Sequence, residues 1–186
     1  ALTEEKRTTI LNAALQCFGK FGYEKASIND IAVAAHISKA SVFQYFGSKK
    51  HLYIYLLEYC KKIIEGIFDK EALDSQTDLF DRIMTSSKIE MESFKTQPFI
   101  LQFISSVWEE TSPDVLDSLV ILTEETCKFR NDMILREDDA LKFKNPEDAG
   151  PVFQMLLLMA EGYAARYRGA DTFDFDTVMD DFQKNI

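Results

Sequence analysis

Apolar residues recur at three- and four-residue steps along almost the entire chain, and this spacing places them on one face of an α-helix. Alternating apolar and polar runs, and short stretches rich in Val, Ile and Thr, are missing. The pattern therefore predicts an all-α protein of about nine helices with no sheet.

The N-terminal half is predicted to hold five helices, separated by residues that favour helix ends. Gly22 follows the first apolar stripe, as glycine does at helix C-termini, whereas Ser27 and Ser38 stand where a side chain caps a helix N-terminus. Gly47 and Ser48 end the third helix. We expect helices over residues 3–21, from 28 through 35, over 39–46 and 49–68, and from 75–78 through 94.

Three prolines begin the helices of the second half. Pro98, Pro113 and Pro146 stand at first helical positions, where the missing backbone N–H costs nothing. They predict helices over residues 98–110, 113–137 and 146–168, and a final amphipathic stretch predicts one over 173–186.

Charge is distributed unevenly along the chain. The 186 residues carry a net charge of −10, but residues 1–50 hold seven Lys or Arg against four Asp or Glu, a balance of +3, which leaves −13 for the rest. Such asymmetry suggests separate tasks for the two parts. We expect a first domain over residues 1–47 and a second over 48–186.

Cysteine spacing and hydropathy indicate the cellular compartment of the protein. Cys17, Cys60 and Cys127 are odd in number and far apart, which fits a reducing environment. The N-terminus begins charged, and the longest apolar run, 155–160, is far shorter than the about 20 residues that span a bilayer. We expect a cytoplasmic protein without membrane contact.

The two short helices in the basic segment have the layout of a helix-turn-helix, with residues 35–37 as the turn. In the second of them, Val42 and Phe46 are four residues apart and are expected to face the core. The remaining sides suit major-groove reading: Lys39 reaches guanine acceptors, Gln44 pairs with adenine, and Ala40 or Phe43 touches a thymine methyl.

From Phe18 to Leu52 the chain reads FGKFGYEKASINDIAVAAHISKASVFQYFGSKKHL. This stretch resembles the N-terminal signature of the TetR family of bacterial transcriptional repressors, closely over residues 3–55 and beyond them only in helix count and length. His36 stands where the family has Gly in the turn, and Phe43 where Tyr is usual. His tolerates a left-handed backbone better than most residues, but Phe43 cannot donate a hydrogen bond to a phosphate.

Together these features predict a protein that binds a double-stranded, palindromic DNA operator. Backbone positioning is assigned to Ser27, Ser38, Tyr45 and Lys49. Any single exposed residue of this kind is commonly just solvated surface, so the prediction depends on the set. The expected DNA-binding residues are Ser27, Asn29, Ser38, Lys39, Ala40, Ser41, Phe43, Gln44, Tyr45 and Lys49.

The helix from Pro146 is apolar nearly all round, which favours burial on two sides, one of them by a second subunit. The stretch GYAARY over residues 162–167 resembles the family's dimerising helix. A homodimer would hold two recognition helices about 34–36 Å apart on DNA. The expected interface residues are Met155, Met159, Gly162, Tyr163, Arg166, Phe175, Met179 and Phe182; the alternative is that they fill the monomer's own core.

The family resemblance also implies a small-molecule pocket in the C-terminal helices, with binding shifting the helix over residues 49–68. Aromatic and methionine side chains suit an apolar or aromatic effector, although each could equally be plain core. Arg130 could meet an anionic ligand group or pair within the chain, for example with Glu161. The candidate lining residues are Tyr59, Ile63, Phe80, Met84, Phe94, Phe103, Trp108, Thr126, Phe129, Arg130 and Phe153.

An enzyme is not predicted. The only histidines, His36 and His51, lie in the DNA-binding segment, and phosphate-binding glycine loops are missing. We therefore expect no catalytic residues, no metal and no cofactor. The favoured function is a repressor that a small effector releases from DNA, and the alternative is a regulator controlled by a protein partner or by a redox thiol.

Overall fold

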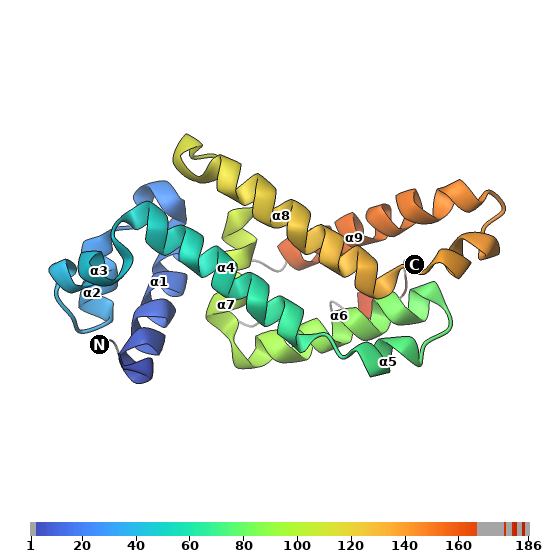
Figure 1. Cartoon of the computed structure of the whole chain (residues 1–186), viewed down its shortest axis with the longest axis horizontal. Helices are drawn as coiled ribbons and strands as arrows, with labels where there is room; N and C mark the ends of the chain where they lie inside the picture. The colour runs from blue at the N-terminus through green and yellow to red at the C-terminus, as the bar shows by residue number, and fades with distance from the viewer. Residues whose placement is uncertain (1–2, 167–176, 178–179, 182–183, 185–186) are drawn as a thin grey trace. The chain divides into compact units, whose positions relative to one another are not determined.

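The computed structural model describes residues 3–166, 177, 180, 181 and 184, and within them it contains helices and no strand (Figure 1). The all-α prediction is confirmed. The elements in chain order are α1 (Glu4–Lys25), α2 (Ile28–Ala34), α3 (Lys39–Phe46), α4 (Lys49–Ile67), α5 (Lys70–Asp74), α6 (Leu79–Thr96), α7 (Pro98–Val107), α8 (Pro113–Ile134), the 3₁₀ turns η1 (Glu137–Lys142) and η2 (Pro146–Asp148), and α9 (Ala149–Arg166).

The structure differs from the sequence prediction in its shortest elements. The α5 helix was missed because five residues are too few to show an apolar period, although Asp69 caps it by accepting a hydrogen bond from Ala72 N. The acidic turn η1 was missed for the same reason. The predicted helix from Pro146 begins with a 3₁₀ turn and becomes α-helical at Ala149, and the predicted final helix, 173–186, lies largely outside the described residues.

The chain forms two compact units, each built from segments that are distant in sequence. Unit 1 comprises Ala1–Gly66 and Thr96–Thr126, and unit 2 comprises Ile67–Lys95 and Cys127–Ile186. The packing units therefore do not coincide with a break after residue 47, and a functional division at that point stays a prediction. In the described ranges, no helix has both the length and the apolar character needed to cross a membrane.

In unit 1, α1 and α7 cross closely around an aromatic cluster. A Cβ atom added at Gly19 would lie 3.0 Å from the backbone nitrogen of Phe103, so a larger residue there would force the two backbones slightly apart. The ring of Tyr53, from α4, lies 5.0 Å from Phe18 and 5.3 Å from Phe103, both edge-on. These rings are almost completely buried, and they join the helix that precedes the helix-turn-helix to the one that follows it.

A bend in α1 gives unit 1 a second connection. Gly22 has φ 70°, outside the helical range, and the helix resumes for one turn up to Lys25. The bend exposes the backbone N–H of Tyr23, which donates to Glu110 Oε2 at 2.6 Å, while Glu110 Oε1 accepts from Ser112 N at 2.9 Å. The Ser112 hydroxyl donates to Glu24 Oε1 at 2.6 Å. The end of α1 is therefore bonded to the loop between α7 and α8.

Unit 2 is built around an apolar cluster and a buried ion pair. Leu79, Ile83, Ile134, Phe153 and Leu156 form the apolar cluster. Beside it, the completely buried Arg82 pairs with the completely buried Asp139, and Arg82 Nε donates to Ile134 O at 2.7 Å. Burial opposes ionisation of Asp139, but hydrogen bonds from Arg82 and from the backbone N–H of Arg136 outweigh it and hold the pKa of Asp139 below its usual value.

The Asp139→Asn variant should lose about 3–5 kcal/mol of unfolding free energy at pH 7, because Arg82 would remain buried without its counter-charge. A lowered folded-state pKa means that this stabilisation is present above the ordinary Asp pKa of about 3.9 and is lost as the pH falls below it. Urea unfolding followed by circular dichroism from pH 7 to pH 2 measures both effects. The exposed neighbour Asp138→Asn is the control, and equal acid sensitivity of Asp139→Asn and wild type would contradict the assignment.

The Glu110→Ala variant should cost about 1–3 kcal/mol of unfolding free energy, because the buried N–H groups of Tyr23 and Ser112 lose their acceptor. Asp117→Ala, an exposed acid on α8, should change stability by less than about 0.5 kcal/mol. Chemical unfolding of the two variants against wild type measures the difference. Equal stability of all three proteins would show that Glu110 does not stabilise unit 1.

Candidate nucleic-acid interface

Both short helices begin at the serines expected from the sequence. Ser27 Oγ accepts from Asn29 N at 3.1 Å and begins α2, and Ser38 Oγ accepts from Ser41 N at 3.1 Å and begins α3. Each hydroxyl keeps its own hydrogen, which it can donate to a phosphate. The Ser38 hydroxyl also lies 2.8 Å from Ser41 Oγ, so it has a competing partner within the chain.

The turn between the helices has the left-handed residue that the sequence analysis anticipated. His36 has φ 55°, the one positive φ outside glycine in the described part of the chain. Its backbone N–H donates to Val33 O at 3.1 Å, and Ile37 N donates to Ala32 O at 2.9 Å, so the turn is closed by hydrogen bonds. A left-handed conformation costs an L-residue about 1–2 kcal/mol, which these bonds offset.

The α3 helix buries one side and presents the other to solvent. Val42 is 1% exposed, whereas Phe43 and Tyr45 are 40% and 41% exposed. The Lys39 ammonium lies 5.9 Å from the centre of the Phe43 ring, a cation–π distance. Lys39, Ala40 and Gln44 are also exposed. Lys39, Ala40, Phe43, Gln44 and Tyr45 thus share the exposed side, and Ser41 is half-buried against Ser38.

Lys49 has a role in the fold that sequence reasoning missed. Its Nζ donates to Glu24 O at 3.0 Å and lies 4.7 Å from the centre of the Tyr23 ring. Lys49 therefore ties the start of α4 to the end of α1. An ammonium has three donors, so two remain for a phosphate. The aromatic neighbour was not visible from sequence spacing, because the bend at Gly22 brings Tyr23 into position.

The expected ligand-lining residues divide between the two units. Tyr59, Ile63, Phe103, Trp108 and Thr126 belong to unit 1, and the other six belong to unit 2. Phe103 is 0% exposed within the aromatic cluster, which supports the alternative that it is core. Trp108 is 50% exposed at the end of α7.

In unit 2, Phe153 is completely buried in the apolar cluster and Met84 packs against it. Phe129 meets Phe68 edge-on at 5.5 Å. Phe94 is buried, whereas Phe80 is 38% exposed. Arg130 donates to both carboxylate oxygens of Glu90, at 2.9 and 3.1 Å, so Glu90 is the partner that the structure assigns to it.

One face of α9 is exposed and apolar. Met155 and Leu158 are 64% and 66% exposed, and Gly162, four residues beyond Leu158, is also exposed. Met159 packs partly against the cluster of unit 2. Leu158 was not among the expected interface residues. The side chains of Tyr163 and Arg166 are not described, and Phe175, Met179 and Phe182 lie outside the described residues.

A second exposed apolar group lies on α8 in unit 1 and was also missed. Leu116, Val120 and Ile121 are 43%, 50% and 57% exposed. Leu116 and Val120 are four residues apart and therefore share a helix face. The sequence signal was present, but the apolar residues of α8 read equally well as a buried stripe.

The comparisons with known proteins agree with the helix-turn-helix. Residues 10–56 match the family model of bacterial regulatory proteins, tetR family. The HTH-type transcriptional activator FasR of Mycolicibacterium smegmatis is 27% identical over 135 residues, which are 72% of this chain and 61% of FasR. The chain therefore spans less than two thirds of that relative.

Two solved structures share the fold over nearly their full length. The fatty acid degradation regulator FadR from Bacillus halodurans has a TM-score of 0.74 at 15% identity, with 96% of each chain covered. The regulator FadR from Bacillus subtilis, solved in complex with stearoyl-CoA, has a TM-score of 0.74 at 13% identity and covers 97% of this chain and 99% of its own. Residues 10–56 thus match the model of the tetR family of bacterial regulatory proteins, and the solved structures show that the chain as a whole shares their fold.

Proposed function

We propose that this protein is a transcriptional regulator that binds a palindromic DNA operator as a homodimer and is released by a small, largely apolar or aromatic effector. The observation that carries the proposal is α3: a capped helix after a tight turn, with one side buried and five residues exposed on the other. Repression is the favoured direction, although the relative FasR is named an activator.

Base reading is assigned to the exposed side of α3. Lys39 suits guanine O6 and N7, Gln44 suits adenine N6 and N7, and the Phe43 ring suits a thymine methyl. Ser27, Asn29, Ser38, Ser41, Tyr45 and Lys49 are proposed to contact the sugar-phosphate backbone or to orient the residues that do. Since Phe43 has no hydroxyl, Tyr45 is the phenol on α3 that can donate to a phosphate.

Dimerisation is supported by the exposed apolar face of α9. In a monomer, Met155 and Leu158 would each leave a large apolar surface exposed to water. Burying such a side chain stabilises a protein or a complex by about 1.5–3 kcal/mol. Gly162 has no atom within 4 Å of an added Cβ, so a second helix could approach its backbone closely.

Effector binding is assigned to the aromatic and methionine residues of the C-terminal helices. Arg130 supports an effector with an anionic group, because its Nε is buried with no hydrogen-bond partner in the described part of the chain. A long acyl chain carried by an anionic coenzyme is the candidate that the B. subtilis FadR complex suggests. A displacement of α4 would reach the end of α1 through Lys49.

Control by a redox thiol is less well supported than control by a ligand. Burial raises the pKa of the Cys60 thiol to about 12, and it also raises the pKa of Cys17. The thiolate is the reactive form, so both side chains are poor redox sensors at neutral pH. A protein partner remains the alternative controlling agent.

Selection from a random duplex library at about 100 mM salt should recover a symmetric motif, because a two-fold dimer presents two recognition helices about one DNA turn apart. Sequencing of the bound DNA is the measurement. Leu158→Glu places a charge in the proposed interface and should give a monomer by light scattering that binds the operator far more weakly. A library without any symmetric enrichment would overturn the proposed function.

Replacing Lys39 and replacing Lys49 should have different effects on operator binding. Lys49→Ala should weaken binding to every sequence and lower the salt slope by about one unit, whereas Lys39→Ala should also alter the preferred bases. Lys49→Ala should in addition destabilise the fold, because the contacts with Glu24 and Tyr23 are lost. Titration of operator and point-mutant duplexes at several salt concentrations tests both, and wild-type behaviour of both variants would show that α3 is not the reading helix.

Stearoyl-CoA should raise the melting temperature of the protein and lower its affinity for the operator. At 100 times the Kd a ligand adds about 2.7 kcal/mol of stability, which for a chain of this size is a shift of roughly 5–10 °C. Coenzyme A without the acyl chain is the matched control. No shift with acyl compounds, together with a stable complex with another protein, would favour the alternative.

A further inference from the structure

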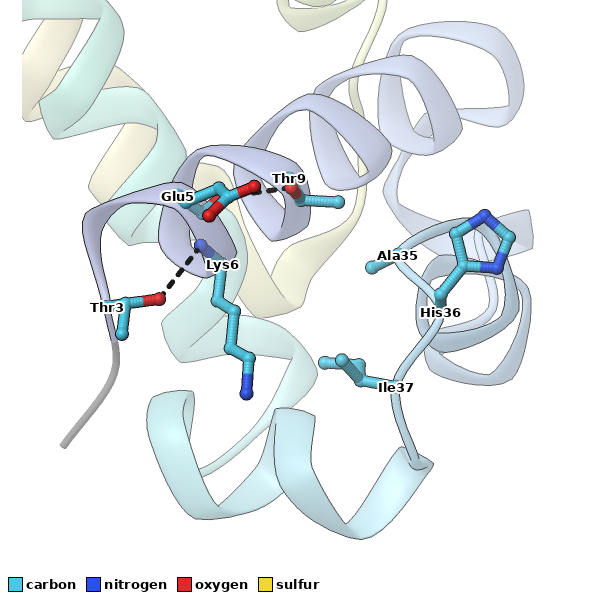
Figure 2. Close-up of a pocket in the computed structure, with 7 residues that line it drawn as sticks. All are labelled: Thr3, Glu5, Lys6, Thr9, Ala35, His36 and Ile37. Carbon is cyan, nitrogen blue, oxygen red and sulfur yellow. Dashed lines mark hydrogen bonds between the residues drawn. The ribbon is translucent and has the colours of Figure 1, made fainter.

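An open pocket lies between the first two turns of α1 and the turn of the helix-turn-helix. None of the residues that line it is among the assigned DNA contacts. Its volume is about 370 Å³, and Figure 2 shows the residues that line it. Thr3, Glu5, Lys6 and Thr9 come from the start of α1, and Ala35, His36 and Ile37 form the turn.

Two of the lining residues carry polar ends that bond to nothing within the described chain. Lys6 is exposed, and its side chain extends from α1 toward Ile37 (Figure 2). The exposed imidazole of His36 stands out from the turn (Figure 2), and only the backbone N–H of this residue is bonded. By contrast, Arg7 on the same turn of α1 donates hydrogen bonds to Tyr55 and to Glu4.

The pocket lies directly beside the start of α3. Ser38 follows Ile37 directly and caps the helix that is assigned to base reading. In a helix-turn-helix the N-terminal residues of the recognition helix enter the major groove, and the DNA backbone borders that groove. Side chains that flank the residues immediately before α3 therefore stand where phosphates run.

The identity of residue 36 is a second, independent observation. Its φ of 55° is a conformation that glycine adopts freely and that costs histidine about 1–2 kcal/mol. A strained residue of this kind persists where the surrounding structure holds it, and such positions concentrate at functional sites. The imidazole has no packing role in return, because it is exposed and unbonded in the described chain.

We propose that the pocket between α1 and the turn is a phosphate-contact site, in which Lys6 and the protonated form of His36 hold the DNA backbone beside the recognition helix. The site rests on the proposed DNA-binding function and extends it to α1. Lys6 supplies a constant charge. His36 makes the contact pH-dependent, because histidine ordinarily changes charge between pH 5 and 8.

The charges around His36 are few and mixed in sign. The pocket lining carries Glu5 and Lys6 from α1. Along the neighbouring helices, α2 carries Asp30 and α3 begins with Lys39. Glu5 opposes a phosphate, whereas Lys6 and Lys39 attract one. Asp30 likewise opposes one, so over these four residues the charges cancel until His36 takes up a proton.

The first test measures the salt dependence of operator binding by Lys6→Gln. Loss of one phosphate contact should weaken binding several-fold near 100 mM salt and lower the salt slope by about 0.9. Lys20→Gln is the matched control, because Lys20 is an exposed lysine about 20 Å further along α1. Equal slopes for Lys6→Gln and Lys20→Gln would overturn the assignment of Lys6.

The second test measures operator affinity between pH 5.8 and pH 8.0. Wild type should gain roughly 3- to 10-fold more affinity on acidification than His36→Asn, since asparagine tolerates the left-handed turn but does not titrate. His36→Gly should lose the same pH dependence while gaining stability, which separates the contact from the strain. His51→Asn should keep the wild-type profile. A pH dependence that survives in His36→Asn would overturn the role of His36.

DNA binding by wild type and the behaviour of the Lys6 and His36 variants test the proposed function and the phosphate site separately. If wild type binds no duplex at all, both the proposed function and the phosphate site are wrong. If wild type binds the operator and the Lys6 and His36 variants match it in salt slope and pH profile, only the phosphate site is wrong.

Discussion

The bend of α1 at Gly22 is the constraint on which the arrangement of the DNA-binding unit depends. A helix that continued straight would keep the Tyr23 N–H and the Glu24 carbonyl inside its own hydrogen-bond ladder. The positive φ at Gly22 turns both groups outward, where Glu110 and Lys49 bind them. One glycine thus fixes how the first helix meets both α4 and the loop before α8.

Electrostatics divides the molecule in a way that complements this geometry. The first 50 positions carry a net charge of +3, whereas the remaining chain carries −13 because its acidic residues outnumber its basic ones. Acidic surface repels DNA, so we expect the rest of the chain to disfavour contact with a duplex and to keep nonspecific affinity low. The overall charge of −10 is therefore compatible with a nucleic-acid partner, provided that the partner touches only one part of the chain.

Features set by local sequence could be predicted, and those set by contacts between distant segments could not. The serine caps, the turn with a left-handed His36 and the buried Val42 all follow from spacing within a few residues. The α5 helix was missed because it is too short to have a period.

The interactions of Lys49, Arg82 and Arg130 were invisible for a different reason. Each pairs with a residue that lies at least 25 positions away, and nothing in one sequence identifies such partners. The same limit applies to the exposed faces of α8 and α9, because an apolar stripe does not reveal which part of it the chain covers itself.

Unit 1 combines the DNA-binding segment with a stretch that lies much later in the chain. Residues 96–126 return to pack against the first 66, where they supply Phe103 to the aromatic cluster and Glu110 to the end of α1. The DNA-binding segment is thus not a self-sufficient cassette. A chimera that joined this segment to another regulator's body would inherit the recognition helix without the surface that holds it, unless the graft also carried α7 and the first half of α8.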